Sequence, residues 1–270
     1  MNDTMGSQAV QLRVEALMGR ALDTLEALLT DPALPADRRA ELALRLLDIA
    51  LVGEPGATPP TPPAGLLPAR CFTIRDFLPP DLHAAAVTAA EQLRDRFVAS
   101  GVTSGEAGYR RSRVLFEDAM PALYQAMCQE IATALPAIGT ALLRPGFAPG
   151  HVEMQMTVHG DGDFFRIHND NAGPEIAYRE ITFVYYFLLR QPCGFHGGAL
   201  RLYETMAAEP PHFDPDRYAD IVPEDNMIVF FDSRLMHEVL KLDVPSGMFE
   251  DARFTLNGWL HARRPAAPAG

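Results

Sequence analysis

The chain has 270 residues, of which 48% are hydrophobic and 21% are charged, and its formal net charge is −12. This apolar content excludes a largely disordered protein, and the most apolar run, 181–189, has about half the length that a membrane span needs. The acidic charge argues against nucleic acid as the main partner, because phosphate backbones bind basic surfaces.

Three cysteines, Cys71, Cys128 and Cys193, stand far apart in the chain and show no C-x-x-C spacing. Such scattered cysteines disfavour both a disulfide framework and a cysteine-based zinc site, and they are typical of a reducing compartment. The N-terminal residues lack the basic and apolar segments of a signal peptide. We therefore predict a cytoplasmic protein without a nucleic-acid or membrane partner.

The first fifty residues show the apolar period of helices. Apolar side chains recur every three or four positions over 10–29, and a second helical stretch, 37–51, follows a break at Asp31-Pro32. Two helices with a short connection predict a helical hairpin over 1–52. Neither helix gathers polar side chains, so we expect a packing role, with these helices as the candidate interface of a homodimer.

Residues 53–69 are dense in proline and glycine, and this composition predicts a linker and the main domain boundary. A second domain is expected over 70–264, followed by a flexible tail at 265–270. It begins with a strand near 71–77 and two helices, 81–100 and 120–135. Short alternating segments separated by turn residues follow, at 150–158, 164–170, 180–189, 199–203, 226–231, 238–242 and 253–261.

Many short strands after a few helices predict a mainly β fold with helical support, in the α+β class. A double-sheet jelly roll preceded by the helical hairpin fits this order of elements best. The stretch 205–220 contains three prolines between two of the expected strands. A long loop of this kind is a candidate lid over a site.

His168 and Asp170 form the most informative pair of polar residues. Side chains two positions apart on a strand point to the same side, so both are expected on one face of segment 164–170. A histidine and a carboxylate in this relation supply two ligands of a 2-His-1-carboxylate iron(II) site, which leaves positions open for a cosubstrate and oxygen. His237 is the expected third ligand, because it follows the strand 226–231 and a short polar turn.

An anion anchor is expected on the last strand. Arg253 and Thr255 share a face there, and a planar guanidinium suits bidentate binding of a carboxylate. With a hydroxyl two residues on, the pair is suited to the far end of a dicarboxylate cosubstrate. The alternative is that Arg253 pairs with an acid of the protein itself, such as Glu204 or Asp225.

With these residues in view, the stretch from Cys71 to His261 resembles the 2-oxoglutarate/Fe(II)-dependent dioxygenase superfamily, in particular its prolyl-4-hydroxylase-like branch. The resemblance rests on H-x-D at 168–170, the later His237-Glu238, and R-x-T at 253–255. Further segments match in order: Gly162-Asp163-Phe164-Phe165, Arg179-Glu180-Ile181-Thr182, Gly197-Gly198-Ala199-Leu200-Arg201-Leu202, and Asn226-Met227-Ile228-Val229-Phe230-Phe231.

The resemblance implies a double-stranded β-helix that binds Fe(II), 2-oxoglutarate and O2, with ascorbate as a candidate reductant. It assigns His168, Asp170 and His237 to the metal, and Arg253 with Thr255 to the cosubstrate. The implied activity is hydroxylation of an unactivated C–H bond of an amino-acid, peptidyl or small natural-product substrate, with release of succinate and CO2.

Other residues are candidates for the same site. One of the adjacent tyrosines, with Tyr185 as the first choice over Tyr186, and Asn257 are the candidate cosubstrate contacts; the alternatives are a place in the sheet core for the tyrosines and an internal polar gap for Asn257. The candidate substrate contacts are Arg166, which shares the face of His168 by parity, Arg179 near the mouth, and Trp259 on the last strand. For each there is a structural alternative, namely a charge partner for the arginines and a core residue for the tryptophan.

Two further expectations concern residues that precede the strand of His168, and two rival functions remain. Met154 or Met156 is expected at the position where relatives carry a cosubstrate tyrosine, and His159 in a turn. The rival functions are a cupin-like metal hydrolase or isomerase without a cosubstrate, and a non-catalytic module that binds a partner through its helices.

Overall fold

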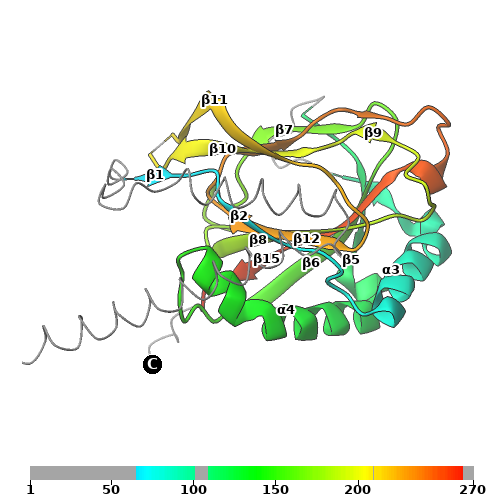
Figure 1. Cartoon of the computed structure of the whole chain (residues 1–270), viewed down its shortest axis with the longest axis horizontal. Coiled ribbons are helices and arrows are strands. Elements are labelled where there is room, and N and C mark those ends of the chain that lie inside the picture. The colour runs from blue at the N-terminus through cyan, green and yellow to red at the C-terminus, as the bar shows by residue number, and fades with distance from the viewer. Residues whose placement is uncertain (1–64, 101–108, 209, 264–270) are drawn as a thin grey trace, which may run out of the picture. The chain divides into compact units, whose positions relative to one another are not determined.

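The structure, a computed structural model, describes residues 65–100, 109–208 and 210–263. Within this part the chain forms two antiparallel sheets that face each other, with two helices beneath the lower sheet (Figure 1). The predicted helical hairpin (1–52), most of the predicted linker and the predicted tail lie outside the described residues.

The larger sheet has seven strands in the order β2-β12-β8-β15-β6-β5-β3. Their bounds are β2 (Cys71–Ile74), β12 (Met227–Asp232), β8 (Arg179–Phe187), β15 (Arg253–His261), β6 (His151–His159), β5 (Arg113–Phe116) and β3 (Val98–Ala99).

The second sheet has six strands, in the order β1-β10-β13-β7-β4 with β11 paired to the other side of β10. These are β1 (Leu66–Leu67), β10 (Leu200–Met206), β13 (His237–Val239), β7 (Phe164–His168), β4 (Arg110–Arg111) and β11 (His212–Ile221); β9 (His196–Gly197) and β14 (Leu242–Asp243) pair separately. The fold is thus mainly β, as predicted, and two facing antiparallel sheets are the arrangement that jelly rolls have.

Strand β8 shows why the run 181–189 is apolar at nearly every position. Its alternate residues from Ile181 to Phe187 belong to the core between the larger sheet and the helices, whereas Val184 and Tyr186 belong to a second core between the two sheets. A strand covered on both faces needs apolar side chains at nearly every position.

Helices α3 (Pro80–Gln92) and α4 (Pro121–Ala141) cover the outer face of the larger sheet. The first is shorter than predicted, because the 3-10 turn Arg94–Arg96 and β3 follow it. The second continues past Pro136, where Ile138 is fully buried and its packing outweighs the lost backbone hydrogen bond. The other 3-10 turns are Glu117–Ala119 and Phe249–Asp251. None of the helices in the described ranges is long and apolar enough to cross a membrane.

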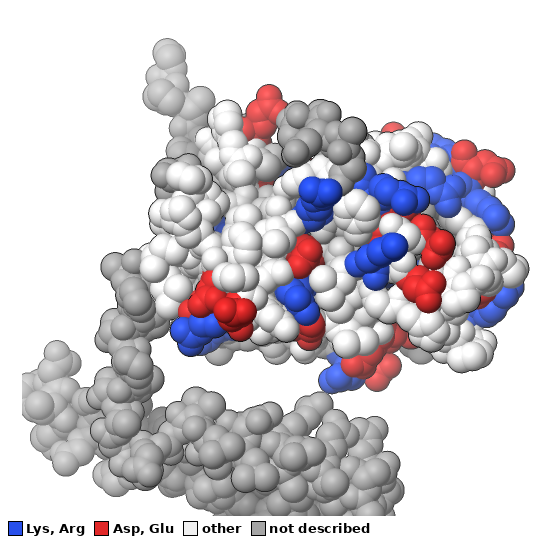
Figure 2. All heavy atoms as spheres, turned by 90° about the horizontal axis from the view of Figure 1, so that it is seen from above, with Lys and Arg blue, Asp and Glu red and all other residues white. Residues whose placement is uncertain are grey.

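The predicted lid is wrong for most of its length. Residues 212–221 form the edge strand β11, and the register against β10 shifts between Tyr203 and Thr205, opposite the segment that contains Pro215. Proline is tolerated on an edge strand at such an irregularity. The outer face of this sheet carries ion pairs, such as Arg201–Asp220 at 2.7 Å, and Figure 2 shows basic and acidic side chains interspersed there.

Candidate metal centre

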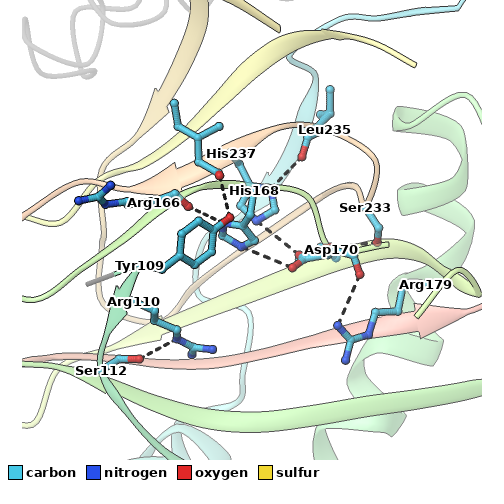
Figure 3. Close-up of polar contacts among 12 residues, drawn as sticks. Tyr109, Arg110, Ser112, Arg166, His168, Asp170, Arg179, Ser233, Leu235 and His237 are labelled. Atoms are coloured by element: carbon cyan, nitrogen blue, oxygen red, sulfur yellow. Dashed lines mark hydrogen bonds and ion pairs between the residues drawn. The ribbon is translucent and has the colours of Figure 1, made fainter. Parts of the chain in front are cut away.

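His168, Asp170 and His237 meet between the two sheets. Antiparallel pairing of β7 and β13 places His168 directly opposite His237, and Asp170 follows two residues after the end of β7. His168 Nε2 lies 3.6 Å from Asp170 Oδ1, and His237 Nε2 lies 3.4 Å from Asp170 Oδ2. One ligand atom from each residue lies within 4.8 Å of the others. The three residues from distant segments therefore converge as predicted (Figure 3).

Hydrogen bonds hold both imidazoles in the form that binds metals. His168 Nδ1 donates to the carbonyl of Arg166 at 2.7 Å, and His237 Nδ1 donates to the carbonyl of Leu235 at 2.8 Å. With the proton on Nδ1, each Nε2 keeps its lone pair toward the cluster. Burial and the neighbouring His237 lower the pKa of His168 to about 3, which favours the neutral ring.

A pair of hydroxyl groups fixes the carboxylate of Asp170. Thr182 Oγ1 donates to Asp170 Oδ2 at 2.8 Å, Ser233 Oγ lies 2.9 Å from the Thr182 hydroxyl, and the Asp170 amide donates to the Ser233 carbonyl. Burial opposes ionisation of Asp170, but the two imidazoles and the Thr182 hydroxyl outweigh it, so the pKa of the carboxyl group lies below its ordinary value. Asp170 is held as an ionised, oriented ligand.

The predicted placement of Arg166 is wrong, because β7 contains a β-bulge. Val239 pairs with Phe165 and His237 with His168, so two steps along β13 match three steps along β7. The extra residue reverses the alternation and turns the Arg166 side chain to the exposed outer face. Phe165 takes the inner position instead, with its ring 3.6 Å from the His168 ring centroid.

Arg253 is a buried cation in the same cavity, only 2% exposed. Its Nη1 lies 3.4 Å from His159 Nδ1, its guanidinium carbon lies 5.0 Å from the centre of the Tyr186 ring, and its Nε has no hydrogen-bond partner. Burial lowers the pKa of Arg253.

The protein acids proposed as alternative partners of Arg253 have other partners. Glu204 lies 3.2 Å from Arg217, and Asp225 lies 3.4 Å from His83. Among the described residues no carboxylate forms an ion pair with Arg253, and its charge is open to an external anion.

The last strand presents the expected face to the cavity. Arg253, Thr255, Asn257 and Trp259 all line it, because β15 is regular and their positions differ by two. Arg179 stacks on Trp259, with its guanidinium carbon 3.6 Å from the ring centre, and forms an ion pair with Glu153. Arg179 therefore has the structural charge partner that the sequence left as an alternative.

The placement expected for Tyr185 is wrong. Its hydroxyl group lies 2.7 Å from His83 Nδ1 under helix α3, on the far side of the sheet from the cavity. The next residue, Tyr186, points toward Arg253, and its hydroxyl group is buried without a partner. Met154 and Met156 likewise face the helices.

Two basic residues that line the cavity, His159 and Arg110, were not among the predicted site residues. His159 ends β6 instead of lying in a turn, and β-sheet pairing sets it opposite Arg253. Arg110 lies on the two-residue strand β4, opposite Phe165, and lines the same cavity. The alternation of β6 could have identified His159, whereas the sequence around Arg110 has no strand-like alternation.

A family model described as the 2OG-Fe(II) oxygenase superfamily matches residues 154–261. An uncharacterized PKHD-type hydroxylase of Synechocystis sp. is 31% identical over 288 residues, which cover 94% of this chain and 95% of the relative.

Two solved structures show the same fold. A prolyl-4-hydroxylase from Pseudomonas putida matches with a TM-score of 0.51 and 23% identity, over 72% of this chain and 93% of its own. A prolyl hydroxylase from Trichoplax adhaerens, solved in complex with a hypoxia inducible factor peptide fragment, matches with a TM-score of 0.51 and 16% identity, over 72% and 84%.

Proposed function

The chain belongs to the 2OG-Fe(II) oxygenase superfamily and is a relative of a PKHD-type hydroxylase. On that premise we propose that it is an enzyme of the prolyl-4-hydroxylase-like branch that hydroxylates an unactivated C–H bond of an amino-acid, peptidyl or small natural-product substrate. One O2 and one 2-oxoglutarate are consumed for each product. One oxygen atom enters the new hydroxyl group, the other enters succinate, and the 1-carboxylate of 2-oxoglutarate leaves as CO2. Bound iron(II) supplies the oxygen activation.

The donor set of the His168, Asp170 and His237 cluster fits iron(II). Two imidazoles, each with its Nε2 toward the cluster, and one ionised carboxylate form a 2-His-1-carboxylate set, which leaves coordination positions for the cosubstrate and oxygen. In the proposal these three residues hold the metal, and Thr182 and Ser233 keep the carboxylate of Asp170 in place. The buried surroundings keep bulk water away from the reacting carbon.

The groups around Arg253 fit the far carboxylate of 2-oxoglutarate. Arg253 Nε, Tyr186 Oη and His159 Nε2 are all buried without hydrogen-bond partners. Buried donors without partners are costly, and a bound carboxylate would accept from such groups. We assign Arg253 and Thr255 to this carboxylate, with Asn257 nearby and Tyr186 in the role expected of Tyr185. The single observation that carries the proposal is this buried guanidinium, which has no carboxylate partner among the described residues and lies in the same cavity as the His-Asp-His cluster.

An anaerobic titration with iron(II) and 2-oxoglutarate tests the proposal. We expect a weak visible charge-transfer band in the wild-type protein, and its loss in His168→Ala and Asp170→Ala. Arg253→Gln should bind iron normally but require much more 2-oxoglutarate, with thermal unfolding as the check that each variant is folded.

Two results would decide against the proposal. A wild-type protein that binds metal but neither binds 2-oxoglutarate nor releases succinate would favour the cupin-like hydrolase or isomerase. A protein that binds neither metal nor 2-oxoglutarate would favour the non-catalytic module. If the proposal is right, a product 16 Da heavier than its substrate, found by mass spectrometry across amino acids and peptides, identifies what is hydroxylated.

A further inference from the structure

We propose that Arg110 binds a carboxylate of the substrate, so that this enzyme hydroxylates a carboxylic acid at a carbon close to its acid group. The inference rests on the proposed function and names the substrate class for the same cavity. It starts from a second arginine in that cavity, on the opposite sheet from Arg253.

Two neighbouring side chains, Phe165 and Ser112, fix the position of Arg110. Strand β4 pairs with β7 so that Arg110 lies opposite Phe165, and its guanidinium carbon lies 4.7 Å from the centre of that ring. Phe165 in turn packs against the ring of His168. Arg110 Nε donates to Ser112 Oγ at 2.8 Å, and Ser112 Oγ lies 2.6 Å from Ser100 Oγ.

This arrangement leaves the two terminal nitrogens of Arg110 for a ligand. Its guanidinium lies below His168 and Asp170, with Nε turned to Ser112 (Figure 3). Two parallel N–H groups on one guanidinium match the two oxygens of a carboxylate. In the ranges that the structure describes, no acidic side chain forms an ion pair with Arg110, and Asp170 is the one carboxylate that lines the cavity. Burial lowers the pKa of Arg110 to about 10, and the negative charge of Asp170 only partly opposes this shift.

Charge balance separates the roles of the two arginines. The charges of iron(II), the 2-oxoglutarate dianion, Asp170 and Arg253 cancel one another when all four are in the cavity. Arg110 then remains as one uncompensated positive charge in a partly buried site, which is unfavourable until an anion joins it. A substrate carboxylate supplies that charge, whereas a neutral substrate does not.

The place of Arg110 also limits where the acid group lies in the substrate. The Phe165 ring lies next to both the guanidinium of Arg110 and the imidazole of His168, so a carboxylate bound by Arg110 lies near the metal ligands. An amino acid or another small carboxylic acid fits this description, and so does a peptide whose terminal or side-chain carboxylate adjoins the oxidised carbon. An interior peptide segment without an acidic residue does not.

The test compares acids with their amides. The full chain is loaded with zinc(II), as a redox-inert replacement for iron, and with 2-oxoglutarate, and ligand-observed NMR measures binding of each L-amino acid and its carboxamide. Short peptides with free and amidated C-termini, with and without aspartate or glutamate, form the other arms and distinguish the sources of the carboxylate. We expect the wild-type protein to bind at least one acid about 10-fold or more tightly than its amide, the usual value of a hydrogen-bonded charge pair.

Arg110→Gln should abolish this preference and leave the affinity for 2-oxoglutarate, measured by calorimetry, within about twofold of wild type. Arg110→Lys keeps the charge but not the planar fork, so it should retain part of the preference, and it serves as a second variant if the glutamine variant is unstable. Arg111→Gln is the matched control, because Arg111 is the exposed neighbour and lies 3.3 Å from Asp163.

Three results would overturn the inference while the proposed function stands. The first is a wild-type protein that binds 2-oxoglutarate but shows no preference for acids. The second is a preference that survives in Arg110→Gln. The third is a loss of 2-oxoglutarate affinity in Arg110→Gln as large as in Arg253→Gln, which would make Arg110 a cosubstrate ligand. A wild-type protein that fails to bind 2-oxoglutarate would overturn the proposed function itself, and this inference with it.

Discussion

The Thr182 hydroxyl group contacts one oxygen of Asp170 and is fully shielded from water. Thr182→Val removes this hydrogen bond but keeps the shape of the side chain, so we expect iron(II) affinity to fall by about 10- to 100-fold, as for other partners that orient metal ligands. Anaerobic metal competition measures the change. Thr182→Ser keeps the hydroxyl group and should bind iron nearly as well as wild type; equal affinity in the valine variant would show that the hydroxyl group does not orient Asp170.

His159 gives a prediction about pH. Burial and the neighbouring Arg253 hold the pKa of His159 well below its ordinary value of 6.5, so the folded protein keeps this ring neutral. Below pH 6.5 His159 binds a proton in the unfolded chain but not in the folded chain. The free energy of unfolding must therefore decrease as the pH is lowered. His159→Asn preserves an acceptor for Arg253 and removes the titration.

Urea unfolding of the metal-free protein between pH 7.5 and 5 tests this sign. Below pH 6.5 the stability of the wild-type protein should fall more steeply than that of His159→Asn, by about 1.4 kcal/mol per pH unit. Above pH 7 the difference between the two proteins should be constant. Parallel curves over the whole range would mean that the folded protein protonates His159 as readily as the unfolded chain.

The alternation of side chains along a strand predicted the cavity face of β15 correctly but that of β8 incorrectly. On β15 the spacing of two places Arg253, Thr255 and Asn257 on the cavity side, as predicted, because the strand has no register shift over these residues. Alternation also separates Tyr185 from Tyr186, but it does not say which of the two faces of β8 is the cavity. Apolar residues occupy both faces of that strand, so the choice depends on tertiary packing.

The bulge in β7 shows where prediction from side-chain alternation along a strand fails. One extra residue between Phe165 and His168 turns Arg166 outward, although the spacing alone places it beside His168. Nothing in segment 164–170 marks the bulge, because it depends on how β13 pairs with β7. Arg110 escaped prediction in the same way, since its strand has only two residues and is defined by pairing with β7.

Gly258 shows how closely neighbouring strands pack in the larger sheet. A Cβ atom there would lie 2.1 Å from the carbonyl oxygen of Glu153 and 2.7 Å from the Phe183 ring. Both atoms are held by the sheet and its core, so we expect Gly258→Ala to lower the free energy of unfolding by about 3 kcal/mol. Urea unfolding measures this loss.

Gly160→Ala is the matched control for Gly258. Its Cβ would have Asp163 Oδ2 at 3.8 Å as its nearest neighbour, which is ordinary contact. This variant should unfold within about 0.5 kcal/mol of wild type. If Gly258→Ala were equally mild, β15 would have room to shift against β6, and the close packing assigned to this part of the sheet would be wrong.

Residues from most of the described chain, between Leu78 and Leu260, form the cavity and the hydrophobic cores around it. The main strands after residue 150 and the pair His168 and Asp170 were predictable, because hydrophobic alternation and the H-x-D spacing are local signals, whereas β3, β4, β5 and β11 were not expected. The two sheets join segments that lie far apart in the chain, such as β2 with β12. The cavity walls therefore depend on contacts that no local pattern encodes.

All residues that line the cavity lie after residue 100, and this predicts the result of removing the N-terminal region. The described residues belong to a unit that begins at Pro63, and its first strand, β1, pairs with β10. A chain of residues 63–270 should therefore unfold in one cooperative transition and bind iron(II) and 2-oxoglutarate as tightly as the full chain, because every cavity residue is retained. If the N-terminal helices form a homodimer, as the sequence indicates, light scattering should find a dimer for the full chain and a monomer for the shortened one. A shortened chain that is unfolded, or that has lost 2-oxoglutarate binding, would show that the N-terminal region supports the site.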